Sequence, residues 1–261
     1  MKVNTFRNEY SDCMNELFLF FYRIYASTMF ILLMFIFIPF MVIAALFGIY
    51  IGGNIIFLLI KLWAIVWYFF CGLRHENEGK QPNKKDGPFI YVANHDSYLD
   101  APITMLSLHG QFRALGKTEI RRIPFFGWIY RYGVILVDRA DKENRAKSVR
   151  ILKHVLSKNI SIIVFPEGGF NYTKELLSRF YDGAFRIAIE TQTPVVPLVY
   201  LNATSVLPRD SFFKLMPGKT KTIFLEKISV KGMTIDDISQ LNEKVKRMIA
   251  NELEKHKNQK Q

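Results

Sequence analysis

The sequence predicts an α/β fold, in which helices flank a mixed sheet and an apolar two-helix membrane hairpin precedes it. Beyond residue 88, short apolar runs alternate with stretches of helical periodicity, a pattern typical of α/β sheets. Before that point, residues 24–60 and 62–73 contain no charged side chain. The polar stretch 75–88, which contains Pro and Gly, separates the two patterns. We therefore expect a membrane-anchoring hairpin over residues 1–74 and a second domain over residues 75–261.

The composition favours an anionic partner and a membrane. The formal net charge is +12, from 35 basic and 23 acidic side chains. That balance fits nucleic acid, an acidic membrane face or phosphorylated substrates. Half of the residues are hydrophobic, which favours the membrane, and no nucleic-acid motif is recognisable, so no nucleic-acid partner is expected. Neither Cys13 nor Cys71 belongs to a C-x-x-C pair, so we expect neither a disulfide framework nor a metal site.

The uncharged N-terminal region is too long for one membrane span. A single helix over 24–73 would be roughly 75 Å long, whereas the hydrocarbon core is about 30 Å thick. The sequence "GIYIGGN", 48–54, has three glycines and predicts a bend between helices near 24–47 and 54–73. A buried hairpin of a soluble protein would fit the same run. Lys61 interrupts the second helix, so it must snorkel, or that helix must lie in the interface.

Basic residues predict the orientation of this hairpin. They flank the apolar region on both sides and are absent from the bend. Because basic flanks stay in the cytoplasm, both ends should face it, with the second domain at the cytoplasmic face of the inner cell membrane. The flanking basic residues are Lys2, Arg7, Arg23, Arg74, Lys80, Lys84 and Lys85.

The second domain is expected to alternate strands and helices, and its best motifs follow strands. Strands are predicted at 88–94, 111–117, 133–138, 161–168, 194–202 and 221–230, and helices at 97–108, 141–158, 183–192 and 236–256. In such sheets ligands bind beyond the carboxyl ends of the strands. The motifs "NHDSYLD", 94–100, and "FPEGG", 165–169, both belong at that edge. Together they predict one site.

His95 is the best general base in the chain. An unperturbed imidazole has a pKa of about 6.5, so its neutral form is available near neutral pH. A carboxylate on the second ring nitrogen would fix the tautomer, and Asp100 is the expected partner. Asp96 is a rival, but with Ser97 it is better explained as a helix N-cap. A cap and a surface histidine would fit the same spacing.

The sequence lacks the motifs of several common catalytic and nucleotide-binding sites. The sequence has no G-x-S-x-G nucleophile elbow, Walker A motif, G-x-G-x-x-G fingerprint or H-E-x-x-H motif. A His–Asp pair without a protein nucleophile suits removal of a proton from a substrate hydroxyl. The basic, membrane-anchored setting suits an acidic lipid as that substrate.

At this point the motifs match a known family. "NHDSYLD" resembles the N-H-x-x-x-x-D box of the glycerolipid acyltransferases, the family of 1-acylglycerol-3-phosphate acyltransferases. Three further boxes follow in the family's order: "GVILVDR" at 133–139, "FPEGG" at 165–169 and "VVPLVY" at 195–200. "GKTEIRRIPFFGW", 116–128, resembles the stretch with a substrate-facing lysine.

The resemblance implies an activity and roles for individual residues. His95, oriented by Asp100, would deprotonate the free hydroxyl of a lysophospholipid, most simply 1-acylglycerol-3-phosphate. The hydroxyl would attack the thioester of acyl-CoA or an acyl carrier protein directly, so the acyl donor is a substrate and no cofactor is implied. The acceptor site would also use Lys117, Arg139, Glu167, Gly168 and Gly169.

One position departs from the family pattern. The third box usually continues F-P-E-G-T-R, and its arginine binds the acceptor phosphate. Here Gly169 and Phe170 stand in place of Thr and Arg. An aromatic ring cannot replace a bidentate phosphate donor, so Arg179, Arg186 or Lys117 must compensate, or the acceptor differs.

Two rival functions remain open. One is acylation of a different lysolipid, such as a lyso-aminolipid. The other is a non-catalytic lipid-binding protein at the membrane, although the intact His95 and Asp100 argue against it.

Overall fold

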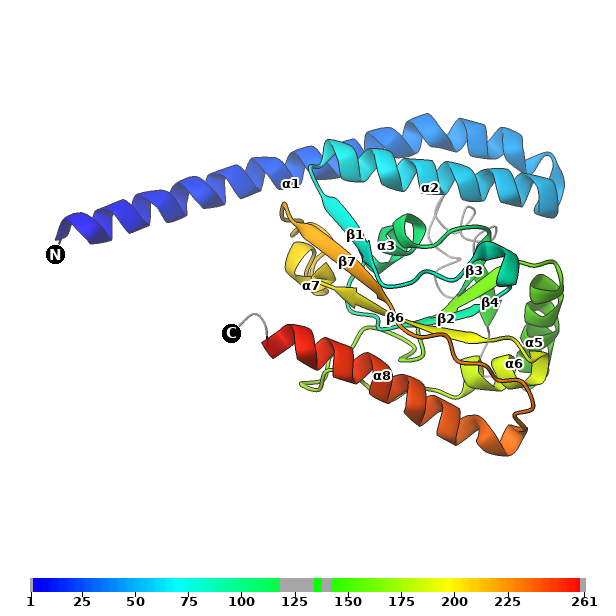
Figure 1. The fold of residues 1–261 in the computed structure, drawn as a ribbon. Helices are drawn as coiled ribbons and strands as arrows, with labels where there is room; N and C mark the ends of the chain where they lie inside the picture. Colours follow the sequence, from blue (N-terminus) through cyan, green and yellow to red (C-terminus); the bar gives the residue numbers. More distant parts are fainter. Residues whose placement is uncertain (1, 118–133, 138–141, 259–261) are drawn as a thin grey trace.

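The computed structural model describes residues 2–117, 134–137 and 142–258 (Figure 1). Among these residues seven strands form one mixed sheet in the order β1-β7-β6-β2-β5-β3-β4. β6 and β7 are antiparallel and the other neighbours are parallel. The predicted α/β fold is confirmed. The strands are β1 Arg74–Glu78, β2 Ile90–Ala93, β3 Phe112–Lys117, β4 Val134–Val137, β5 Ser161–Val164, β6 Val195–Leu201 and β7 Lys219–Phe224.

Helices cover both faces of this sheet (Figure 1). Successive side chains of a strand face opposite sides, and β2 shows the result: Tyr91 and Ala93 join a core with α1, α2 and α3, while Ile90 and Val92 join one with α5, α6 and α8. This central strand is thus buried on both faces. The helices are α1 Lys2–Ala45, η1 Gly48–Gly52, α2 Gly53–Phe70, η2 Lys84–Asp86, α3 Asp100–Ser107, α5 Lys142–Ser157, α6 Gly183–Thr191, α7 Ala203–Val206, η4 Ile235–Asp237 and α8 Ile238–Asn258.

The N-terminal hairpin has the predicted fold-back. α1 and α2 pack together and are joined by the π-helical turn η1. Gly52 is required there, because an added Cβ would collide with the carbonyl oxygen of Ala44. The predicted start of the first helix at residue 24 was wrong, since α1 already begins at Lys2. Residues 2–23 include charged and polar side chains but no Gly or Pro, so the helix extends beyond its uncharged part.

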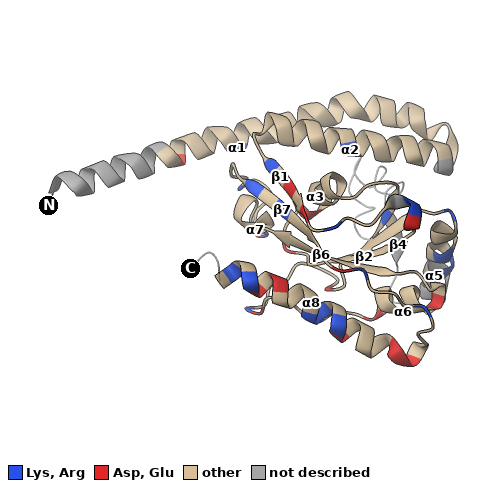
Figure 2. Cartoon of the chain, in the orientation of Figure 1, with Lys and Arg blue, Asp and Glu red and all other residues tan. Residues whose placement is uncertain are grey.

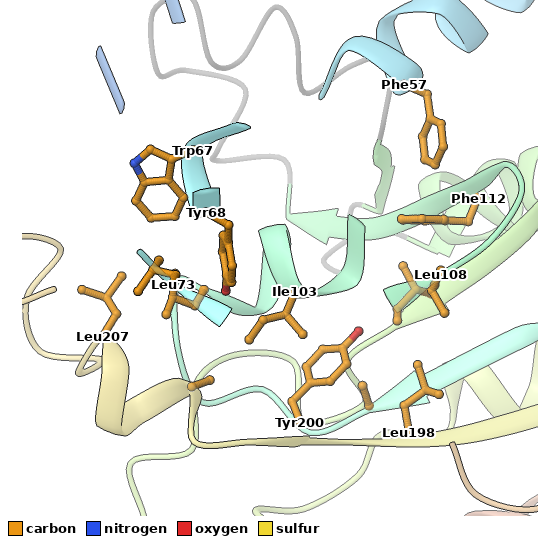
Figure 3. Packing of buried hydrophobic residues seen from close by; sticks show 14 of the residues in the cluster. Phe57, Trp67, Tyr68, Leu73, Ile103, Leu108, Phe112, Leu198, Tyr200 and Leu207 are labelled. Carbon is orange, nitrogen blue, oxygen red and sulfur yellow. The ribbon is translucent and has the colours of Figure 1, made fainter. Parts of the chain in front are cut away.

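α2 lies on the sheet domain along its length. At its start, Asn54 Oδ1 accepts a hydrogen bond from Arg113 Nη2 at 3.2 Å. In its middle, Lys61 Nζ donates to the carbonyl oxygen of Leu108 at 2.9 Å. Near its end, Trp67 and Tyr68 enter the core beside the sheet (Figure 3). Lys61 therefore faces the protein, which explains how an apolar helix tolerates it.

The opposite sides of α1 and α2 are apolar and uncovered. Both helices are long and apolar enough to cross a membrane, yet only 22% and 33% of their most apolar windows are buried. Phe35 is 71% exposed and Leu46 82%. Charged residues are sparse on the described part of the hairpin (Figure 2). The buried hairpin of a soluble protein is thus a poor description of this surface.

One strand was missed in the sequence. The polar stretch 75–88, expected to be a boundary, begins inside β1, which pairs in parallel with β7. β1 lies at the edge of the sheet and four of its five residues are exposed, so it lacks the apolar alternation that marks a strand. Its cross-strand ion pairs are Lys219 with Glu76, and Lys221 with Glu78 at 2.7 Å.

Candidate active site

A short loop between β2 and α3 carries His95, at the carboxyl end of β2. The Nδ1 atom of His95 lies 2.8 Å from Oδ2 of Asp100, the first residue of α3. Because a carboxylate can only accept hydrogen bonds, Nδ1 is the donor, and the lone pair of the neutral ring lies on Nε2. Asp100 is fully buried, whereas the His95 side chain is 25% exposed. The pair therefore presents a basic nitrogen on an oriented ring.

Asp100 also holds the loop itself. Its Oδ2 accepts hydrogen bonds from the backbone nitrogens of Asp96, at 2.8 Å, and Ser97, at 3.0 Å. The predicted helix N-cap at Asp96 and Ser97 is wrong. α3 begins only at Asp100, its N-cap position is Leu99, and no side chain caps it. The physical reason is that the Asp100 carboxylate already takes the backbone donors of the preceding loop.

The FPEGG box forms a turn instead of the end of a strand. β5 stops at Val164, and the nitrogen of Gly168 donates to the carbonyl oxygen of Phe165 at 3.1 Å. Pro166 at the second position and Gly168 at the fourth are typical of a type I turn. Gly168 also has a φ of 75°, a conformation that favours glycine. Gly169 continues this loop and is partly buried.

Glu167 connects this turn to the base. Its Oε1 accepts a hydrogen bond from the backbone nitrogen of His95 at 3.0 Å. Its Oε2 accepts two from Ser178, from the nitrogen at 2.8 Å and from Oγ at 2.9 Å. The nitrogen of Asn171 also donates to the carbonyl oxygen of His95 at 3.2 Å. Glu167 thus braces the loop that carries the base.

Burial raises the pKa of the two other carboxylates of the site, Glu167 and Asp96. Desolvation raises the pKa of Glu167, and its hydrogen bonds from Ser178 and His95 oppose that rise. Desolvation also raises the pKa of Asp96, and the nearby Asp100 raises it further. The guanidinium of Arg209 acts in the opposite direction on Asp96, from a distance of 3.5 Å.

Asn94 fixes the start of the loop and was not singled out in the sequence. Its Nδ2 donates to the carbonyl oxygen of Tyr200 at 3.0 Å, and its Oδ1 accepts from the nitrogen of Tyr200 at 2.8 Å. The asparagine side chain thereby continues the pairing of β2 with β6 beyond the strand end. The last, Pro-centred box thus meets the first box directly. The position of Asn94 as the first residue of "NHDSYLD" was the signal in the sequence that could have identified it.

Aromatic rings connect His95 to the hairpin. The His95 ring stacks on Phe165 with centroids 4.2 Å apart and meets Phe170 at 4.5 Å. Phe170, the residue that departs from the family pattern, therefore packs against the base itself. The contacts continue from Phe170 to Tyr98 at 4.9 Å, from Tyr98 to Phe212 at 5.4 Å, and from Phe212 to Phe30 of α1 at 5.7 Å.

The remaining expected site residues are less fully placed. Lys117 ends β3, and nothing of its side chain is described. Arg139 lies outside the described residues. Arg179 and Arg186, considered as substitute donors, are exposed. Within the described parts of the chain, no group of three or more His, Cys, Asp or Glu side chains is placed to hold a metal ion.

Comparisons with known proteins agree on one family. A sequence profile of the Acyltransferase family matches residues 74–201. The 1-acyl-sn-glycerol-3-phosphate acyltransferase of Haemophilus influenzae is 30% identical over 188 residues, covering 70% of this chain and 75% of the relative. The chain belongs to this acyltransferase family. The expected relationship is confirmed.

Other relatives show how far the similarity extends. The chloroplastic 1-acyl-sn-glycerol-3-phosphate acyltransferase LPAT1 of Arabidopsis thaliana is 34% identical over 165 residues, which is 62% of this chain. The match spans only 46% of that longer protein. The crystal structure of the 1-acyl-sn-glycerophosphate acyltransferase PlsC of Thermotoga maritima has a TM-score of 0.71 at 22% identity, covering 94% of this chain and 97% of that one. This family member shares the fold.

Proposed function

We propose that the protein transfers a fatty acyl chain from an acyl thioester to the free hydroxyl of 1-acylglycerol-3-phosphate, giving phosphatidic acid for phospholipid biosynthesis. The donor is acyl-CoA or an acyl carrier protein. The observation that carries the proposal is the His95–Asp100 pair, held at 2.8 Å at the carboxyl edge of the sheet in a chain of this family. The lysophospholipid acceptor follows from what the related enzymes are named for.

The reaction follows from the geometry of the pair. Nε2 of His95 takes the proton of the acceptor hydroxyl as its oxygen attacks the thioester carbonyl carbon. The new ester C–O bond forms and the C–S bond breaks. The departing thiolate then takes the proton from the imidazolium. The buried Asp100 carboxylate stabilises the imidazolium between these two steps and keeps the ring in one tautomer.

The membrane setting is part of the proposal. The uncovered apolar faces of α1 and α2 would lie in the membrane, with the sheet domain at its cytoplasmic face. Because α2 packs on the sheet domain from Asn54 to Tyr68, the hairpin would embed beside that domain instead of projecting from it. The aromatic contacts from Phe30 to His95 would then lead from the lipid to the base.

A second acceptor class is favoured by one observation. Phe170, where the family pattern has arginine, contacts the ring of His95 and offers no hydrogen-bond donor to a phosphate. A lysolipid with a less acidic head group, such as a lyso-aminolipid, would fit beside this aromatic side chain. The His95–Asp100 chemistry would be the same.

Acceptor-dependent release of thiol tests the function. Purified full-length protein in detergent is given acyl-CoA and, separately, acyl carrier protein loaded with the same chain. Each is combined with lysophosphatidate, a lyso-aminolipid or no acceptor. We expect thiol release only with a lysolipid, and fastest with lysophosphatidate. Faster release with the lyso-aminolipid would mean that this lipid, and not lysophosphatidate, is the acceptor. No thiol release with any combination of donor and acceptor would indicate a non-catalytic lipid-binding protein.

A further inference from the structure

Arg209 is a cation at the site that sequence reasoning did not single out. It lies in the connection between α7 and β7, where no motif marks it. Its Nη1 is 3.5 Å from Oδ1 of Asp96, the residue next to His95. Its guanidinium carbon lies 5.9 Å from the ring centroid of Tyr172, two residues after Phe170. Arg209 therefore joins the two loops that surround the base.

These contacts leave most of the guanidinium available. Arginine has five N–H donors in a planar fork. Among the described residues, the partners of Arg209 are one oxygen of Asp96, at a long 3.5 Å, and the face of Tyr172. The side chain is 29% exposed, so it is partly desolvated yet reachable. A guanidinium oriented by a ring and a carboxylate, with donors to spare, is suited to bidentate recognition of an oxyanion.

The position of Arg209 matches the shape of the acceptor. In 1-acylglycerol-3-phosphate the carbon with the free hydroxyl is bonded directly to the carbon that carries the phosphate. An acceptor hydroxyl at His95 must therefore place its head group close by. Arg209 contacts Asp96, the residue that follows His95, and also Tyr172. The Tyr172 ring lies 6.4 Å from the ring of Phe170, which lies 4.5 Å from the ring of His95.

We propose that Arg209 binds the oxyanion of the acceptor's head group, phosphate or carboxylate, with Asp96 and Tyr172 positioning its guanidinium. This inference rests on the proposed acyl transfer to a lysolipid. It supplies the cationic donor that Phe170 cannot provide. It also gives Asp96 a role beside the base, because its carboxyl group orients Arg209.

Direct binding tests the inference apart from turnover. Full-length His95→Ala protein in detergent is titrated with lysophosphatidate, with a lysolipid whose head group ends in a carboxylate, and with monoacylglycerol, which has no head-group anion. A further titration uses acyl-CoA, the other source of phosphate. We expect Arg209→Gln in this background to weaken binding of the favoured anionic lysolipid by about 10- to 100-fold. Binding of monoacylglycerol and acyl-CoA should stay unchanged.

Two further variants separate recognition from loop structure. Arg209→Lys keeps the charge but loses the fork, so it should restore part of the lost affinity. Lys214→Gln removes the same charge from the same connection, where Lys214 pairs with Asp210 at 2.9 Å and is 54% exposed, and it should bind like the parent protein.

Three outcomes would overturn the inference. The first is that Arg209→Gln binds both anionic lysolipids as tightly as the parent protein. The second is that it loses as much affinity for monoacylglycerol as for the anionic lysolipid. The third is that it loses affinity for acyl-CoA alone. None depends on turnover, whereas the proposed function is tested by thiol release from protein with His95 intact. The two ideas can therefore fail separately.

Discussion

At the scale of single residues, one oxygen atom organises the base. Oδ2 of Asp100 accepts hydrogen bonds from the ring of His95 and from the backbone nitrogens of Asp96 and Ser97. The carboxylate therefore sets the ring tautomer and the loop conformation together. Glu167 repeats the arrangement from the other side, because it binds the backbone nitrogen of His95 and both donors of Ser178.

Asp100→Asn should reduce turnover far more than it reduces stability. An amide oxygen at the Oδ2 position can still accept from the backbone and from Nδ1, but a neutral amide cannot stabilise the imidazolium that forms during transfer. We expect kcat to fall by about 10²–10⁴-fold, the usual range for loss of general-base catalysis. Thiol release and the melting temperature measure the two effects. An unchanged rate would return Asp96 to consideration as the partner of His95.

Phe170→Arg restores the arginine of the family pattern and tests whether the site needs a phosphate donor at that position. If Arg209 already binds the oxyanion, added charge at 170 should change KM for lysophosphatidate little. Losing ring contacts with His95 and Tyr98, worth about 0.5–1.5 kcal/mol, should lower kcat by roughly two- to tenfold. The comparison is KM and kcat for each acceptor. A large gain with lysophosphatidate and loss with another lysolipid would indicate a site built for a less acidic head group.

The residues of the site differ in how far the sequence predicts them. His95 and Asp100 are five positions apart, so local spacing and motif order suffice to pair them. Arg209 is far from Asp96 in the chain, and only the folded sheet brings them together. Asp96 and Ser97 were misjudged because cap propensity describes a helix start, and α3 starts later than its polar sequence indicates.

At the scale of elements, the hairpin has two chemically different faces. One face joins the core with α3 and the sheet, and the other leaves large apolar side chains exposed. Apolar run length predicts both helices, because any such run must be buried in protein or lipid. The length of the run cannot predict which side of each helix packs on the protein and which side is left uncovered, nor where α1 starts. The edge strand β1 escaped prediction because its stability comes from pairing with β7 and not from an apolar face.

A matched pair of substitutions separates these faces. Phe35 is 71% exposed on α1, whereas Phe57 of α2 is 2% exposed and packs on Phe112 with ring centroids 4.9 Å apart. Phe35→Asp should weaken liposome binding by roughly 100-fold, from a cost of about 3 kcal/mol, and leave the melting temperature unchanged. Phe57→Ala should lower stability by about 3–5 kcal/mol.

Liposome flotation and thermal unfolding measure the pair. Wild-type protein should leave membranes with detergent and stay with them in high salt, since apolar burial is the main attraction. Release by salt alone, or equal flotation of Phe35→Asp and wild type, would mean that charge holds the protein at the membrane.

At the scale of the whole molecule, the anchor and the catalytic part share one core. The cluster on the hairpin side of the sheet contains residues of α1, α2, α3, β2, β5 and β6. Figure 3 shows part of it, including Phe57 and Trp67 of α2, Ile103 of α3 and Tyr200 of β6. We propose the division at residues 74 and 75 as one of role, between lipid anchoring and acyl transfer. Because the two parts bury each other's apolar surface, the site would be held at a fixed height relative to the lipid.

If His95 is the general base of an acyl transfer, the substitution His95→Ala must remove most of the activity without unfolding the protein. The measurement is lysolipid-dependent thiol release from acyl-CoA by full-length wild-type and variant protein, each first shown to have the same melting temperature and liposome binding. We expect the variant to have a rate lower by about 10²–10⁴-fold. A folded, membrane-bound His95→Ala protein that turns over at nearly the wild-type rate would contradict it.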